Sequence, residues 1–228
     1  MSDHVRDLSS VRTATDRLLS AAAELDDAAL AGPSLLPGWT RGHVLAHIAR
    51  NADALVNVLE GRPMYLSDTA RDADIGRDAP RAPAVQLADV RDTAARFQEA
   101  AAALPDWSRI VLLRNGVTDA AANLPFRRLI EVELHHVDLG AGYPLEALPG
   151  DFTERAIGYL ARRFEAHPDV PPTALADDSG HTWRTGGTAG DHVTVDGTAA
   201  DLLGWLSGRR DGGALTVSGG ALPKLPAL

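Results

Sequence analysis

The sequence contains no cysteine and a single lysine, Lys224. Without cysteine the chain has no disulfide bond, no zinc–thiolate site, no iron–sulfur cluster and no cysteine nucleophile. Any metal must therefore be bound by histidine, aspartate or glutamate, and any thiol chemistry needs a thiol from outside the protein. The scarcity of lysine leaves almost no candidate for Schiff-base or P-loop chemistry.

Positive charge and long apolar runs are also scarce. The chain has 22 Lys and Arg against 31 Asp and Glu, a net charge of -9, whereas a nucleic-acid-binding surface needs clustered cations. No apolar run approaches the roughly 20 residues of a membrane helix. Residues 1–7 carry both signs of charge instead of the apolar stretch of a signal peptide. We therefore expect a cytoplasmic protein without nucleic-acid or membrane partners.

Helical periodicity dominates the first two-thirds of the chain. Apolar residues at three- and four-residue spacing predict helices over roughly 4–30, 40–60, 84–103 and 123–139. Thr40 and Asn123 are the expected N-caps of the second and fourth helices. The polar stretch 62–83 is predicted to be a long surface loop, and residues 107–122 fit either a strand or a helix. Four such helices favour a four-helix bundle.

The pattern changes after Pro149. Asp151 and Glu154 form a capping-box-like start for a helix to about residue 166. Short strands are predicted around 173–176, 181–184, 192–195 and 214–217, with a helix capped by Thr198 and ending at Ser207. We therefore expect a helical domain over 1–149 and a small α+β domain over 150–228.

The fourth predicted helix carries an acid, a histidine and a second acid on one strip. Glu131, His135 and Asp138 fall within an arc of about 60°, at about 100° per residue, between apolar neighbours. The Glu-x-x-x-His spacing lets two side chains converge on one metal ion. The same spacing also fits an ion pair at a seam between helices. On this helix alone both interpretations stay open.

The second predicted helix supplies a further histidine. His47 and Asn51 lie at the edge of its apolar stripe, and His43 lies one turn earlier. A lone histidine at such an edge is more often a hydrogen-bonded core residue. If His47 meets Glu131 and His135, the set has two histidines and one carboxylate. Three protein ligands with an open fourth position are typical of catalytic zinc, and the same set suits non-haem Fe(II).

Three segments resemble one known family. Residues 36–55, which include the run Leu-Pro-Gly-Trp-Thr-Arg-Gly-His and His47, resemble the N-terminal signature of the mycothiol-dependent maleylpyruvate isomerases. The Glu131-x-x-x-His135-x-x-Asp138 helix resembles the second signature, and residues 196–209 resemble the C-terminal α+β domain. The resemblance covers essentially the whole chain. It implies a DinB-like four-helix bundle followed by a small α+β domain.

The resemblance also implies roles for individual residues. The family's zinc ligands fall on His47, Glu131 and His135, although another divalent metal would fit the same set. Asp138 is then expected to assist catalysis by orienting a ligand histidine.

Two further residues are assigned to catalysis or cofactor binding. Arg209 is expected to receive a substrate carboxylate, because guanidinium pairs with carboxylate through two hydrogen bonds. Arg209 also fits a surface position after a helix, and the neighbouring Arg210 fits the binding role as well. We place Asn51, together with Arg209, among the residues that bind the cofactor.

The implied activity is the isomerisation of maleylpyruvate to fumarylpyruvate, a gentisate-pathway step of aromatic catabolism, with mycothiol and Zn²⁺ as cofactors. A thiolate adds to one alkene carbon, the resulting single bond rotates, and expulsion of the thiol leaves the trans product. Metal coordination ionises a thiol whose free pKa is about 8.5. The expected partners are a small substrate and this thiol, and the chain is expected to be a monomer or a weak homodimer.

Three alternatives remain at this point. A mycothiol S-transferase would use the same residues and release the adduct with another electrophile. A non-catalytic metal- or thiol-binding module would bind metal tightly without turnover. An Fe(II) oxygenase would contain iron and consume oxygen.

Overall fold

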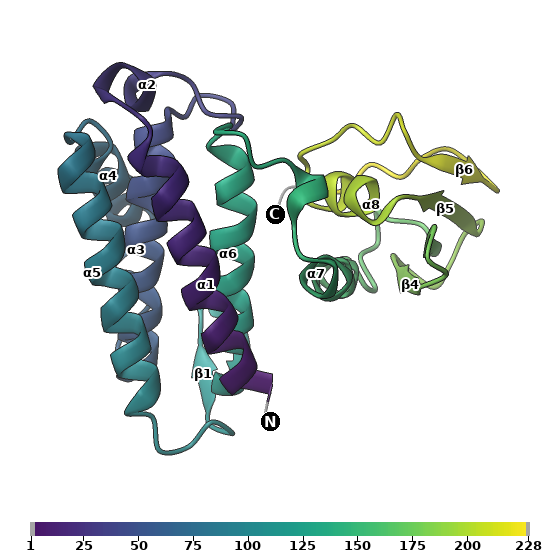
Figure 1. Cartoon of the computed structure of the whole chain (residues 1–228). Helices are drawn as coiled ribbons and strands as arrows, with labels where there is room; N and C mark the ends of the chain where they lie inside the picture. Colours follow the sequence, from purple (N-terminus) through teal and green to yellow (C-terminus); the bar gives the residue numbers. More distant parts are fainter. Residues whose placement is uncertain (1–2, 227–228) are drawn as a thin grey trace. The chain divides into compact units, whose positions relative to one another are not determined.

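The computed structural model describes residues 3–226, which form two compact units that divide between Tyr143 and Pro144. Figure 1 shows the helical first unit and the mixed second unit. The outermost residues of the two predicted domains, 1–2 and 227–228, lie outside the described residues, as does part of the charged N-terminal stretch. Among residues 3–226, none of the helices combines the length and the apolar character that a membrane span requires.

The first unit is a four-helix bundle. Helices α1 (Asp3–Ala23), α3 (Arg41–Leu59), α5 (Pro83–Ala102) and α6 (Leu124–Asp138) lie side by side, with α3 and α1 each packed against α5 and α6 (Figure 1). Fully buried side chains such as Leu18, Leu45, Phe97 and Leu124 come from all four helices and form its core. The predicted fold class, a helical bundle followed by a small α+β domain, is confirmed.

Two predicted boundaries in the first unit are wrong. The first predicted helix is divided, because the Asp26 side chain accepts a hydrogen bond from the Ala29 amide at 2.8 Å and starts α2 (Asp27–Ala31). The predicted loop 62–83 contains α4 (Asp68–Asp78), which Ser67 caps by accepting from the Ala70 amide at 3.0 Å. Both helices begin at side-chain caps, which hydrophobic periodicity does not register.

The segment that fitted either a strand or a helix is a hairpin. Strands β1 (Ile110–Leu112) and β2 (Thr118–Ala120) pair antiparallel, and the short 3₁₀ turn η1 (Arg114–Gly116) joins them. A second 3₁₀ turn, η2 (Ala121–Asn123), leads into α6. The predicted Asn123 cap is wrong, since the Asn123 side chain instead donates to Asp119 Oδ1 at 2.6 Å.

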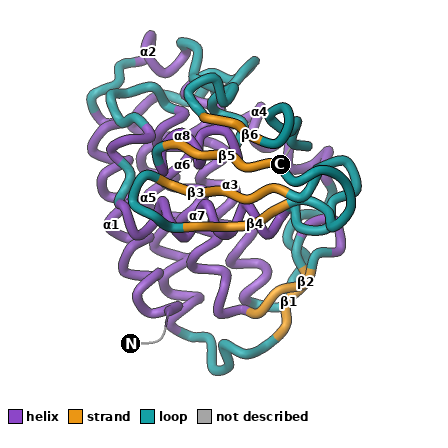
Figure 2. Tube along the Cα trace, turned by 90° about the vertical axis from the view of Figure 1, so that its right-hand side faces the viewer, coloured by secondary structure: helices purple, strands orange, loops and turns teal. Residues whose placement is uncertain are grey.

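The second unit combines two helices with a four-stranded sheet (Figure 2). After the turn η3 (Leu145–Ala147) come α7 (Gly150–Arg163), β3 (Thr173–Asp177), β4 (Thr182–Thr185), β5 (Val193–Gly197), α8 (Ala199–Leu206) and β6 (Thr216–Ser218). The strand order is β4-β3-β5-β6, with β3 and β5 parallel and the outer pairs antiparallel. The α7 helix packs on β4, and α8 packs on β3 and β5.

The predicted caps of this unit have different outcomes. Thr198 caps α8 by accepting from the Asp201 amide at 3.1 Å, as predicted. The capping box of Asp151 and Glu154 is wrong, because α7 already begins at Gly150 and has no side-chain cap. Pro149 precedes the helix, and its fixed backbone angle suits a helix start without such a cap.

Candidate metal centre

The beginning of α3 sets the position of His47. Thr40 Oγ1 accepts from the His43 amide, and His43 Nδ1 accepts from the Thr40 amide, both at 3.3 Å. His43 thus completes a capping box, the role usually held by Glu or Gln. The predicted Thr40 cap is confirmed, and His43 is accounted for by the helix start.

A close backbone approach holds α3 against the segment after α4. The buried Gln86 side chain donates to the carbonyl oxygens of Asp78 at 2.9 Å and Ala79 at 3.0 Å, and to that of Gly42 at 3.3 Å. A Cβ atom at Gly42 would lie 2.2 Å from the Ala79 oxygen. Glycine is therefore required at this position, and the first turn of the helix that carries His47 is fixed in place.

Helices α3 and α6 bring the three predicted ligands together. The ligand atoms of His47, Glu131 and His135 all lie within 4.8 Å of one another. Glu131 Oε2 is 2.9 Å from His47 Nε2 and 3.3 Å from His135 Nε2. The two imidazole rings meet edge to face, with their centroids 4.5 Å apart. Two nitrogens and one carboxylate oxygen thus converge on one point, a donor set that suits a divalent ion.

The environment keeps two of these donors deprotonated at neutral pH. Burial and, after it, the nearby charge of His135 lower the pKa of His47 to about 4. Burial raises the pKa of the Glu131 carboxyl, but hydrogen bonds from His135 and His47 outweigh this and hold the pKa well below its usual value. The Glu131 side chain is 35% exposed, and its contacts with the two histidines determine that the net shift of its pKa is downward. Metal ligands need these deprotonated forms.

Asp138 orients the second histidine. Its side chain is 1% exposed, and Oδ2 lies 2.8 Å from His135 Nδ1. Burial lowers the pKa of His135, but Asp138 and Glu131 raise it by more, so the net shift is upward. A proton held on Nδ1 leaves Nε2 facing Glu131 as the ligand atom, which is the usual arrangement around a metal-binding histidine.

The prediction from sequence missed Arg71, on α4. Arg71 Nη2 lies 3.2 Å from His47 Nδ1, and the side chain is only 16% exposed. The guanidinium pairs with Asp72 at 2.7 Å and lies over the Tyr65 ring, 5.9 Å from its centroid. The segment 62–83 was predicted to be a loop, so the position of Arg71 was not predicted. In the sequence, a serine that can cap a helix, Ser67, followed by the acidic Asp68 indicates the start of α4.

Two family models together match most of the chain. The mycothiol maleylpyruvate isomerase N-terminal domain matches residues 11–140, and the MDMPI C-terminal domain matches residues 147–227. The chain belongs to the mycothiol maleylpyruvate isomerase family. The family predicted from the sequence is therefore confirmed, and so is the expectation of an isomerase enzyme.

Solved structures agree with this family, and the chain also matches two curated proteins. The crystal structures of the mycothiol-dependent maleylpyruvate isomerase and of its mutant with one histidine replaced by alanine superpose with TM-scores of 0.87 and 0.89. Each is 27% identical and covers 99% of this chain and 97% of its own. Two uncharacterized proteins of Mycobacterium tuberculosis, from strains CDC 1551 and H37Rv, are 26% identical over 89% of this chain and 85% of theirs.

The other residues predicted for this family's site have different surroundings. Asn51 is buried in the bundle one turn beyond His47, and its Oδ1 accepts from Arg128 Nη1 at 2.8 Å. Arg209 follows α8 in the second unit, where its Nη1 donates to the Ser207 carbonyl oxygen at 3.1 Å. Arg210 pairs with Asp201 at 2.6 Å and also with Glu146, so its side chain is already engaged. The cofactor and substrate roles of Asn51 and Arg209 stay predictions.

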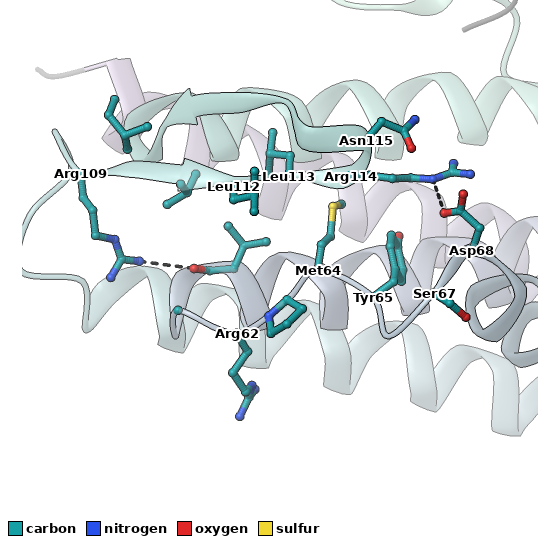
Figure 3. A pocket seen from close by; sticks show the side chains of 15 residues that line it. Arg62, Met64, Tyr65, Ser67, Asp68, Arg109, Leu112, Leu113, Arg114 and Asn115 are labelled. Atoms are coloured by element: carbon teal, nitrogen blue, oxygen red, sulfur yellow. Dashed lines mark hydrogen bonds and ion pairs between the residues drawn. The ribbon is translucent and has the colours of Figure 1, made fainter.

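A cavity of about 580 Å³ opens between the 61–68 segment and the β1–β2 hairpin (Figure 3). Met64 points toward Leu112 and Leu113 of the hairpin, and Tyr65 points toward Arg114, whose ion pair with Asp68 at 2.7 Å lies at one end. Its lining also includes apolar side chains of Val58, Ile110 and Val111. Tyr65 connects this cavity to Arg71, and Arg71 in turn contacts His47.

Proposed function

We propose that this chain is a mycothiol-dependent isomerase that converts maleylpyruvate to fumarylpyruvate, with Zn²⁺ held by His47, Glu131 and His135. The observation that carries the proposal is the convergence of these three ligand atoms within 4.8 Å in a chain that matches both domains of the family. Three protein ligands with a fourth position open are typical of catalytic zinc sites.

The residues present fit a zinc ion. A neutral His47 and an ionised Glu131 offer free lone pairs at neutral pH, and Asp138 holds His135 with Nε2 toward the same point. When bound, the ion supplies the charge that ionises a thiol with a free pKa of about 8.5. The chain has no cysteine, so the thiol comes from the cofactor.

The reaction balances without an oxidant or reductant. The sulfur forms a C–S bond to one alkene carbon, and the electron pair of the double bond moves into the conjugated carbonyl group. The remaining C–C single bond rotates. The electron pair then returns, the C–S bond breaks, and the thiol leaves unchanged while the alkene is trans. Negative charge develops on the substrate between the two steps, so a nearby cation lowers the barrier.

Arginine side chains supply such cations. Arg71 places a guanidinium 3.2 Å from the His47 ring, within reach of a carboxylate that enters beside the triad. We propose this binding role for Arg71, and we retain the sequence-based proposal that Arg209 receives a substrate carboxylate.

A second candidate is a mycothiol S-transferase that acts on a larger apolar electrophile. The cavity next to Tyr65 favours it, since a volume of about 580 Å³ is larger than a small dicarboxylate requires and the lining includes the apolar side chains of Val58, Met64 and Leu112 beside arginines. The metal set and the thiol are the same, and only the elimination step differs.

One assay separates these functions. The metal-loaded protein is incubated with maleylpyruvate with and without mycothiol, and the products are identified by chromatography. Formation of fumarylpyruvate only with the thiol supports the isomerase. If the protein forms thiol adducts with other electrophiles but no fumarylpyruvate, the isomerase proposal is wrong and the S-transferase is supported. If the protein binds metal but turns over neither kind of substrate, both enzymatic proposals are wrong and a non-catalytic metal-binding module is supported.

A further inference from the structure

Arg128 is a fully buried cation that has no ion-pair partner among residues 3–226. It lies on α6, its side chain is 0% exposed, and Nη1 donates to the Ile48 carbonyl oxygen and to Asn51 Oδ1, each at 2.8 Å. Its Nε and Nη2 are buried and, in the described part of the chain, have no hydrogen-bond partner. Burial of an unpaired charge is costly, and an apolar side chain of similar size is often more stable. The stability of the bundle therefore does not explain this arginine.

The two hydrogen bonds of Arg128 join the helices that carry the ligands. Ile48 follows His47 directly on α3, and Asn51 lies one turn beyond His47. Arg128 itself lies one turn before Glu131 on α6. The contacts therefore hold α3 and α6 together within one turn of His47 and Glu131. Guanidinium suits this task, because its planar group bonds two acceptors in fixed directions.

The Arg128 side chain also keeps its charge. The pKa of Arg128 is lowered to about 10, because burial outweighs the electrostatic interactions with Glu131, Tyr65 and Asp53, which raise it. A pKa of about 10 leaves the guanidinium protonated at neutral pH. Solvent and salt screen a buried charge weakly, so it acts strongly on a neighbouring site.

We propose that Arg128 is a positioning residue of the metal centre, which holds α3 and α6 at the ligand-binding separation and favours an anionic fourth ligand. With Glu131 as the one carboxylate among the ligands, the Arg128 charge offsets the negative charge that this carboxylate contributes. A thiol at the open position then ionises more readily. This last step rests on the proposed function, because it takes the fourth ligand to be the sulfur of the thiol cofactor.

Two substitutions separate the charge from the hydrogen bonds. Asn51→Asp keeps the acceptor oxygen at Oδ1, so the hydrogen bond from Arg128 that joins α3 and α6 remains. The added carboxylate neutralises the positive charge of Arg128. In Arg128→Gln the charge is lost, and a shorter donor replaces the guanidinium. We expect both variants to raise the apparent pKa for thiol binding by about one unit, a tenfold loss of ionised thiol at neutral pH.

The measurement uses the full chain loaded with Co²⁺, whose absorption changes when a sulfur ligand binds. Mycothiol is titrated between pH 6 and 9, and metal affinity is measured separately by chelator competition. We expect Arg128→Gln to weaken metal binding about tenfold and Asn51→Asp to leave it unchanged, because only Arg128→Gln loses the guanidinium hydrogen bonds that join α6 to α3. Arg17→Gln is the control, since Arg17 pairs with Glu133 on α6, which is not one of the three proposed ligands. It is expected to keep the wild-type profile.

The possible results distinguish this inference from the proposed function. If the wild-type protein binds metal and thiol but Asn51→Asp keeps the wild-type pH profile, the charge role of Arg128 is wrong and the isomerase proposal stands. If Arg128→Gln folds and keeps full metal affinity, the positioning role is wrong. If the wild-type protein binds no metal, both proposals fail. Should Arg128→Gln not fold, Asn51→Asp still tests the charge, and Arg128→Lys tests the hydrogen bonds with the charge retained.

Discussion

Replacement of Asp138 by asparagine removes one charge and almost no volume from the metal centre. The carboxylate is 1% exposed and lies 2.8 Å from His135 Nδ1, so solvent does not compensate for its loss. An asparagine amide can donate to Nδ1, which would leave the proton on Nε2, the atom that faces Glu131. We expect Zn²⁺ affinity at pH 8 to fall about 10- to 100-fold, or about 1.4–2.8 kcal/mol.

The pH dependence of this loss has a defined sign. Asp138 raises the pKa of His135, so in the wild-type protein protons compete with the metal once the pH falls below that raised pKa. Without the Asp138 carboxylate this competition weakens. The difference in affinity between Asp138→Asn and the wild-type protein should therefore be larger at pH 8 than at pH 6.

Chelator competition at both pH values measures this difference. Asp177→Asn is a matched control, because Asp177 Oδ2 contacts His181 Nδ1 at 2.9 Å in the second unit and neither residue belongs to the ligand set. It should leave metal affinity unchanged. Equal affinities of Asp138→Asn and the wild-type protein at pH 8 would refute the role assigned to Asp138. If Asp177→Asn loses as much metal affinity as Asp138→Asn, the loss in both variants results from general destabilisation of the protein.

Three further predictions concern pH, packing and backbone space. Dialysis at pH 5 should remove metal that the protein retains at pH 8, because His135 with its raised pKa binds a proton first; equal metal content at both pH values would contradict this. The two ring nitrogens of His136 are buried and have no hydrogen-bond partner among the described residues, and the ring stacks on Tyr143 with the centroids 4.0 Å apart. His136→Phe should therefore raise the free energy of unfolding by about 1–2 kcal/mol, and a lower free energy of unfolding in a urea titration would argue against it. Gly42→Ala would place a Cβ atom 2.2 Å from a backbone oxygen and should cost about 1–3 kcal/mol, whereas Gly76→Ala on α4 meets no atom within 4 Å and should not lower the melting temperature.

The ligand strip on α6 was predictable because it lies within one helix. The helical repeat places Glu131, His135 and Asp138 on one side whatever packs against them. The contact with His47 depends on the packing of α3 on α6, which periodicity alone does not determine. There the resemblance to a family supplied the pairing, and the structure brings the three side chains together.

The prediction from sequence missed Arg71 and Arg128 for different physical reasons. Arg71 lies on α4, a helix stabilised by its Ser67 cap and by ion pairs such as Arg77 with Asp74, in a segment whose composition is typical of a loop. Arg128 occupies a buried position on α6, but an arginine in a helix is nearly always exposed, so its type predicts the opposite. The contacts that give the two side chains their roles, of Arg71 with His47 and of Arg128 with Ile48 and Asn51, join residues that are distant in sequence.

The central claim is that His47, Glu131 and His135 together bind one divalent ion. Elemental analysis of the purified chain and of the variants His47→Ala and His135→Ala tests it directly. We predict about one zinc ion per wild-type chain and a large loss in each variant, with both variants still helical by circular dichroism. Undiminished metal in the folded variants would contradict the assignment.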